Sequence, residues 1–118
     1  MLEFSENKPI YRQIADYAFN CIIGEMWLPG AQIPSVRDLS AALGVNSRTV
    51  MKAFDYLLEI GVIELRRGMG FFLRPEARDK VLAVGREDFF KTTLPAFIDE
   101  MKRLDIKFEQ LIEIIKKN

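Results

Sequence analysis

The sequence predicts a mainly α-helical fold with one small β-hairpin, a winged helix-turn-helix followed by a helical tail. Three observations lead to this prediction. Apolar residues recur at helical spacing through residues 10–58, and the pattern is interrupted at Gly44. Two β-rich runs around a glycine-containing loop follow in residues 62–73. A second helical pattern then fills the chain from residue 90 onward.

The first helix is predicted to run from Pro9 to about Gly24. Proline suits the first turn of a helix, where its missing N–H costs nothing. Four residues behind it recur at helical spacing: Ile10, Ile14, Tyr17 and Cys21. Residues 28–34 hold two prolines and a glycine, so they predict a turn and a short extended piece.

Two short helices are predicted next, joined by a tight turn. Ser35 is a good N-cap with an acidic residue, Asp38, three positions further on, and this helix stops at Gly44. Asn46 is a good N-cap for the following helix, which continues to Gly61. Two such helices around a glycine-containing turn are typical of a helix-turn-helix.

A β-hairpin follows. Residues 62–65 and 71–73 are rich in β-branched and aromatic residues, and they flank the loop 66–70. The composition changes at Pro75, so we expect a winged helix-turn-helix domain over residues 1–75 and a helical tail over residues 76–118.

The tail carries an apolar stripe at the spacing of a helix-packing seam. Its members are Phe90, Leu94, Phe97, Met101, Leu104, Phe108, Leu111 and Ile115. A tail this short cannot bury the stripe alone. We therefore expect the stripe to pack either on the winged helix of the same chain or on a second subunit. Pro95 predicts a kink in a long helix. The unbroken spacing permits one continuous helix, but we expect a break near Asp105–Lys107 and a short last helix.

The helix over residues 46–60 has the pattern of a DNA-recognition helix. Its polar residues lie opposite its apolar face and gather at its N-terminal end. Arg48 is the best candidate for a bidentate contact to guanine, and Lys52 could contact guanine or a phosphate. Asn46, Ser47 and Thr49 suit phosphate oxygens near the helix start.

Two further groups complete the predicted DNA interface. Ser35 and Arg37 begin the preceding helix, which crosses the DNA backbone in this motif. Arg66 and Arg67 lie at the hairpin tip, where Gly68 allows close approach to a minor groove. Each group alone is also compatible with a solvated surface, a helix cap or an ordinary turn. Together, in this order, they predict a double-stranded DNA partner.

Composition limits the other classes of function. The 17 basic and 17 acidic residues cancel, so a nucleic acid must be bound by a local patch. The chain has no histidine and no glycine-rich phosphate loop, so we expect no enzyme, no catalytic residue, no metal and no cofactor. Its single cysteine is expected in the core. No apolar run predicts a membrane span or a signal peptide, so we expect a cytoplasmic protein.

Residues 9–73 resemble the N-terminal domain of the GntR family of bacterial transcription regulators. The motifs that match are Pro9-Ile10-Tyr11, Leu28-Pro29-Gly30, Ile33-Pro34-Ser35, Arg37, Leu39, Gly44-Val45-Asn46, Thr49-Val50, Lys52-Ala53, Gly61 and Gly68-x-Gly70. The short tail resembles that of the YtrA subfamily. This resemblance implies a pair of tail helices used for dimerisation, a repressor, and frequent association with ABC-transporter genes.

The resemblance also implies positions of DNA contact: Ser35, Arg37, Asn46 to Thr49, Lys52 and the wing around Gly68. Two departures from the subfamily stand out. Ser47-Arg48 replaces a frequent Pro-Asn pair, which suggests a different operator preference, and Asp105 replaces a frequent glycine between the tail helices.

The favoured interpretation is a homodimeric, sequence-specific repressor that reads a near-palindromic operator. The helix over residues 46–60 would enter the major groove, and the wing over residues 66–70 would lie at the minor groove. The alternative is a winged-helix module that binds protein and leaves Arg48 idle. The aromatic residues of the tail could line a pocket, although a core or a dimer interface is the better interpretation. The sequence does not identify a small-molecule effector.

Overall fold

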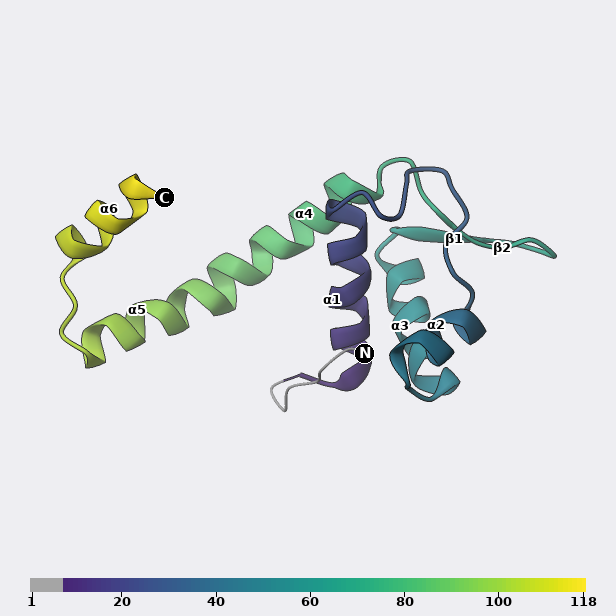
Figure 1. Cartoon of the computed structure of the whole chain (residues 1–118), viewed down its shortest axis with the longest axis horizontal. Helices are drawn as coiled ribbons and strands as arrows, with labels where there is room; N and C mark the ends of the chain where they lie inside the picture. Colours follow the sequence, from purple (N-terminus) through teal and green to yellow (C-terminus); the bar gives the residue numbers. More distant parts are fainter. Residues whose placement is uncertain (1–7) are drawn as a thin grey trace. The chain divides into compact units, whose positions relative to one another are not determined.

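The computed structural model describes residues 8–118, which form two compact units (Figure 1). The first unit extends through Leu82 and the second runs from Ala83 to Asn118. The first unit contains three helices and a hairpin: α1 (Ile10–Ile23), α2 (Val36–Leu43), α3 (Ser47–Glu59), β1 (Ile63–Arg66) and β2 (Gly70–Leu73). The predicted class, a mainly helical fold with one small hairpin, is confirmed.

The turn between α2 and α3 forms as its cap residues predict. The Ser35 side chain accepts a hydrogen bond from the Asp38 N–H at 3.0 Å, which satisfies a donor at the start of α2. Gly44 ends that helix in the left-handed conformation, with φ 67°. The Asn46 side chain then accepts from the Arg48 N–H at 2.8 Å and caps α3. These local bonds fix where α3 begins.

The hairpin has a third extended segment beside it. β1 and β2 pair antiparallel from Ile63 opposite Leu73 to Arg66 opposite Gly70. On its other edge β2 bonds to residues 30–33, through Gly30 N–H to Leu73 O at 2.8 Å and two further backbone bonds. Figure 1 shows the hairpin projecting beyond the helices of its own unit. The extended piece predicted over residues 28–34 therefore forms part of the wing.

The core of the first unit lies between α1, α3 and the base of the hairpin. Phe54 of α3 is fully buried and packs edge-on against Phe71 of β2, with ring centroids 4.9 Å apart. Cys21 is a free, buried thiol, as predicted from its place in the helical pattern. The largest side chains buried with Phe54 are Ile14, Val50, Leu57, Val62, Ile63, Leu73 and Val81.

The first unit extends beyond the boundary expected at Pro75. Helix α4 (Ala77–Asp88) begins just after it, and its first turns bury Ala77 and Val81 completely. Gly61 lies against the Lys80 side chain of α4, in a conformation with φ 75° that favours glycine. The first turns of α4 therefore belong to the first unit, because the apolar side chains at the start of α4 are buried in the core of that unit.

The second unit contains the rest of α4 and two further helices, α5 (Leu94–Arg103) and α6 (Phe108–Lys117). A π-helical turn, η1 (Phe89–Thr93), connects α4 to α5, and the Leu94 N–H bonds to Phe89 O. Proline at 95 cannot donate to the carbonyl four residues earlier, and a wider turn just before it accommodates this loss. The irregularity that the sequence predicted as a kink at Pro95 is thus a π-helical turn directly ahead of that residue.

The two tail helices are separate, in agreement with the break expected near Asp105–Lys107. Asp105 adopts φ 54°, a left-handed conformation that aspartate tolerates better than most residues. Helix α6 then starts after Lys107, whose N–H donates to Gln110 Oε1 at 2.9 Å. A left-handed residue cannot continue a right-handed helix, so the apolar spacing runs on while the helix does not.

Candidate nucleic-acid interface

The N-terminal end of α3 presents polar side chains to solvent. Ser47 and Arg48 are exposed and Thr49 is half-buried, whereas Val50 and Phe54 on the opposite side are completely buried. This amphipathic arrangement fixes the rotation of the helix about its axis. The exposed backbone N–H groups of the first turn add a partial positive charge beside these side chains.

Arg48 is free to reach a ligand. Among residues 8–118 its side chain makes no hydrogen bond, ion pair or ring contact, and only its backbone N–H is used by the Asn46 cap. Asn46 is more restricted, because its side-chain oxygen already accepts that bond. Its amino group can still donate to a phosphate oxygen.

The start of α2 has a similar arrangement. Ser35 and Arg37 are both exposed. The Ser35 oxygen accepts the bond from Asp38 N–H, so its hydroxyl hydrogen can still be donated to a phosphate. The short turn between α2 and α3 places Ser35 and Arg37 in the same unit as the candidate residues of α3.

Lys52 is engaged with an aromatic ring. Its ammonium nitrogen lies 4.4 Å from the centroid of the Tyr11 ring, a cation–π contact from α3 to α1. Tyr11 in turn meets Tyr56 edge-on at 6.4 Å, and the Arg12 guanidinium lies 4.5 Å from the centroid of Tyr56. Helical spacing alone gave no sign of this cluster, because it joins two helices that are distant in sequence.

The wing residues divide into two kinds. Arg66 is the last residue of β1, and its guanidinium lies 4.0 Å from the centroid of Phe72, with Nε 3.8 Å from Glu64. It therefore lies along the hairpin rather than projecting from the tip. Arg67 and Gly68 form the exposed tip itself, where Gly68 has φ 76°. Arg67 is the cation at the tip that can reach a groove.

Two pairs of titratable groups show perturbed pKa values. A hydrogen bond from the Arg74 guanidinium, with Nε 2.8 Å from Glu76 Oε1, lowers the pKa of Glu76. Burial raises the pKa of the Cys21 thiol, an effect that a hydrogen bond with Tyr17 partly offsets. Neither pair lies among the candidate DNA contacts, and residues 8–118 contain no cluster of three or more metal-ligating side chains.

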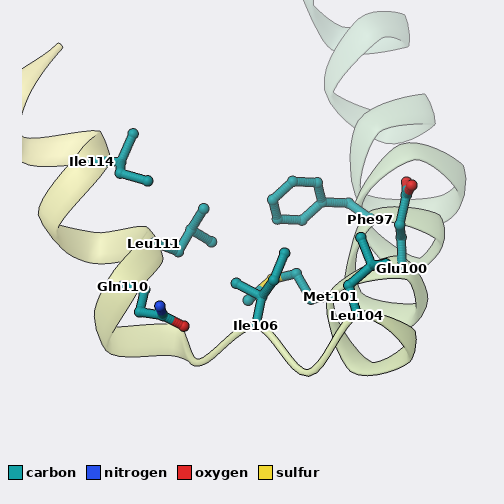
Figure 2. Close-up of a pocket in the computed structure, with 8 residues that line it drawn as sticks. All are labelled: Phe97, Glu100, Met101, Leu104, Ile106, Gln110, Leu111 and Ile114. Atoms are coloured by element: carbon teal, nitrogen blue, oxygen red, sulfur yellow. The ribbon is translucent and has the colours of Figure 1, made fainter.

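The tail has an apolar groove between α5 and α6 (Figure 2). It encloses about 360 Å³, and Figure 2 shows Phe97, Ile106 and Leu111 pointing into the space between the helices. The other lining residues are Glu100, Met101, Leu104, Gln110 and Ile114. Phe89, Phe90, Phe97 and Phe108 are the tail aromatic residues that the sequence allowed in a pocket, and of these Phe97 lines the groove. Phe89 and Phe90 instead pack edge-on against each other, with ring centroids 5.1 Å apart.

The seam residues of the tail are not buried. Phe90, Phe97, Leu104, Phe108 and Ile115 are between 43% and 65% exposed. Leu94, Met101 and Leu111 are half-buried. So many exposed large apolar side chains on one short segment indicate a surface that binds another apolar surface.

A winged helix-turn-helix with exposed cations on its recognition helix and wing tip defines a class, the DNA-binding transcription regulators. The model of bacterial regulatory proteins of the gntR family matches residues 10–73. This chain belongs to the GntR family.

Two relatives are similar in sequence to this chain over nearly its whole length. The HTH-type transcriptional regulator YhcF of Bacillus subtilis is 32% identical, over 97% of this chain and 93% of YhcF. The HTH-type transcriptional repressor YtrA of the same organism is 32% identical, over 92% of this chain and 83% of YtrA. This similarity supports the YtrA-like subfamily. These relatives are regulators, so the prediction that the chain is not an enzyme is confirmed.

Solved structures give the same result. A GntR family transcriptional regulator from Listeria monocytogenes has a TM-score of 0.76 and 32% identity, covering 98% of this chain and 99% of its own. The DNA-binding domain of AraR, solved in complex with operator ORR3, has a TM-score of 0.55 and 27% identity. It covers 62% of this chain and 88% of its own. No helix of the described segment, residues 8–118, is long and apolar enough to cross a membrane.

Proposed function

We propose that this protein is a homodimeric repressor that binds a near-palindromic operator in double-stranded DNA. Helix α3 enters the major groove of each half-site, and the wing at residues 66–70 lies at the adjacent minor groove. Ser35 and Arg37 contact phosphates beside them. The two-fold symmetry of the dimer matches the two-fold symmetry of the operator.

The observation that supports DNA reading most strongly is the start of α3. An arginine without another partner among the described residues stands at the exposed end of a helix whose other face is buried. Arginine binds guanine O6 and N7 bidentately, which is the commonest specific contact in protein–DNA complexes. The resemblance to the AraR domain, which was solved on its operator, supports the same mode of docking.

The tail supports a dimer. Its apolar seam is half-exposed or exposed along α5 and α6, and a second copy of the chain presents the same seam. A two-fold interface requires such a self-complementary surface. The assignment as a repressor draws on the name of the relative YtrA. We place the protein in the cytoplasm, where an operator is accessible.

Regulation would act through the spacing of the two DNA-binding units. Residues 8–118 contain no separate ligand-binding domain beside the winged helix and its tail. A change in the order or pairing of the tail helices would change the distance between the two recognition helices. Because both half-sites must be contacted at once, such a change would lower operator affinity.

The test is a selection of bound duplexes from a random DNA pool at about 0.15 M salt, where binding through phosphates alone is weakened. We expect enrichment of an inverted repeat, and the Arg48→Ala variant should enrich a repeat that is degenerate at one position of each half. If the native protein enriches no sequence, the interpretation as a protein-interaction module replaces this proposal.

A further inference from the structure

The wing tip is attached to the segment that precedes the helix-turn-helix. Gln32 Nε2 donates a hydrogen bond of 2.7 Å to the carbonyl oxygen of Met69, which lies in the turn of the hairpin. The two residues are 37 positions apart in sequence. A side chain from outside the hairpin therefore contacts its turn.

The backbone places Gln32 at this position. Residue 32 forms an isolated antiparallel bridge with Phe72, and the flanking bond from Ile33 N–H to Phe71 O measures 3.0 Å. Ile33 is buried, so the segment is anchored by a core side chain next to Gln32. These bonds direct Gln32 along β2 toward the turn.

Gly70 makes room for the Gln32 side chain. A Cβ atom at position 70 would lie 2.8 Å from Gln32 Nε2, which is closer than real Cβ atoms approach a neighbour. Gly70 also adopts φ 112°, a conformation that side chains rarely allow. Gly70 and Gln32 thus form a matched pair, in which the glycine permits the approach that the amide needs.

We propose that Gln32 is a positioning residue for the wing. It holds the Met69 carbonyl, and with it Arg67 and Gly68, at a fixed place relative to the start of α2. Ser35 lies three residues after Gln32, so the phosphate contact at α2 and the minor-groove contact at the tip are set by one short segment. This inference rests on the proposed function, since it assigns a role within DNA binding.

The physical reason is preorganisation. A hairpin tip with few contacts samples many conformations, and ordering it on DNA costs conformational entropy. The Gln32 bond orders the tip before DNA arrives, so less binding energy is lost. Loss of one such bond should weaken operator binding about threefold to tenfold, with the effect concentrated at the minor-groove positions.

The test compares Gln32→Met with Gln13→Met. Methionine has nearly the shape of glutamine but cannot donate, and Gln13 in α1 also donates from Nε2 to a backbone carbonyl, that of Lys8 just before the helix, at 2.8 Å. Binding is measured on operators whose wing-contacted pair is A·T, I·C or G·C. The I·C pair has the same minor-groove groups as A·T but different major-groove groups, so it isolates minor-groove reading.

We expect the native protein and Gln13→Met to bind A·T and I·C alike and to disfavour G·C. Gln32→Met should lose this discrimination while it keeps the preference for the guanine read by Arg48. A general loss of stability would lower affinity for all three operators equally. Unchanged discrimination in Gln32→Met would overturn the proposal.

A second measurement does not depend on DNA. NMR relaxation of the free protein should show faster motion of the amides of Gly68 to Gly70 in Gln32→Met than in the native chain. If the native protein selects no DNA sequence, the proposed function fails, whereas this result still decides whether Gln32 orders the wing. Equal motion of the tip in both proteins would show that it does not.

Discussion

Replacement of Arg48 by alanine should remove sequence reading at one base pair of each half-site and leave the fold intact. The side chain is exposed and makes no hydrogen bond, ion pair or ring contact with the other residues of the described segment, 8–118. Exposed substitutions of this kind change the free energy of unfolding by less than about 0.5 kcal/mol. The thermal midpoint should therefore stay almost unchanged. Any loss of binding then reports a lost contact to DNA.

The expected loss follows from the contact that the geometry supports. A bidentate arginine–guanine pair contributes about 1–3 kcal/mol to discrimination. A dimer makes this contact twice, so the full operator should lose about 2–6 kcal/mol, or from roughly thirtyfold to more than ten-thousandfold in affinity. A base change at the contacted pair should cost the native protein a similar amount and the variant almost nothing.

The assay is fluorescence anisotropy of labelled duplexes, with each protein titrated at several salt concentrations. Arg86→Ala in α4, an exposed arginine outside the candidate interface, is the matched control and should bind as the native chain does. A phosphate contact would instead weaken binding to all duplexes and reduce the slope of log affinity against log salt by about one per contact. That pattern would refute base reading by Arg48, and unchanged affinity would refute docking of α3.

Three further predictions concern the tail and the core. Leu104→Glu should convert the dimer to a monomer in sedimentation and abolish tight operator binding. The control Glu109→Gln, an exposed change on α6, should do neither. A Leu104→Glu variant that stays dimeric would show that the apolar seam is not the dimer interface. Gly85→Ala should raise the free energy of unfolding by about 0.5–1 kcal/mol in thermal melts, because Gly85 lies in a helix with open space around it. Gly61→Ala should lower the free energy of unfolding by about 1–2 kcal/mol, because the φ of 75° at Gly61 disfavours a side chain. Similar effects of the two substitutions would contradict these two expectations. Burial raises the pKa of Cys21 in the folded state, so the unfolded chain loses the thiol proton at a lower pH than the folded chain does. The free energy of unfolding should therefore fall as pH rises above about 8.5, and Cys21→Ala should remove that pH dependence.

The helix-turn-helix could be predicted closely because its determinants are local. The caps at Ser35 and Asn46 bond to N–H groups two or three residues away, and Gly44 adopts its left-handed conformation between them. Side-chain periodicity predicted the buried face of α3 for the same reason. Local sequence is sufficient where the contacts that form an element span only a few residues.

Contacts between distant segments could not be predicted in this way. Nothing in the spacing of residues indicated that Lys52 would lie on the Tyr11 ring, or that Gln32 would reach the carbonyl of Met69. The π-helical turn ahead of Pro95 was also missed, because proline indicates an interruption without specifying its form. The two side-chain contacts depend on how the folded helices and strands pack against one another.

The tail illustrates a different limit. Its apolar spacing continues through the break at Asp105, so periodicity alone did not distinguish one helix from two. The left-handed backbone of Asp105 ends the helix and so separates α5 from α6. Aspartate in a sequence indicates such a conformation less strongly than glycine does. The short last helix gives the chain two apolar surfaces to pair, on α5 and α6.

Dimethyl sulfate protection of the selected operator tests most directly whether a dimer reads the major groove through α3, because this reagent methylates guanine N7 in the major groove and adenine N3 in the minor groove. We expect protected guanines in two patches related by two-fold symmetry, with protected adenines beside each patch where the wing lies. Arg48→Ala should lose the guanine protection alone. Protection of a single patch, or no guanine protection by the native protein, would contradict a dimer that reads the major groove through α3.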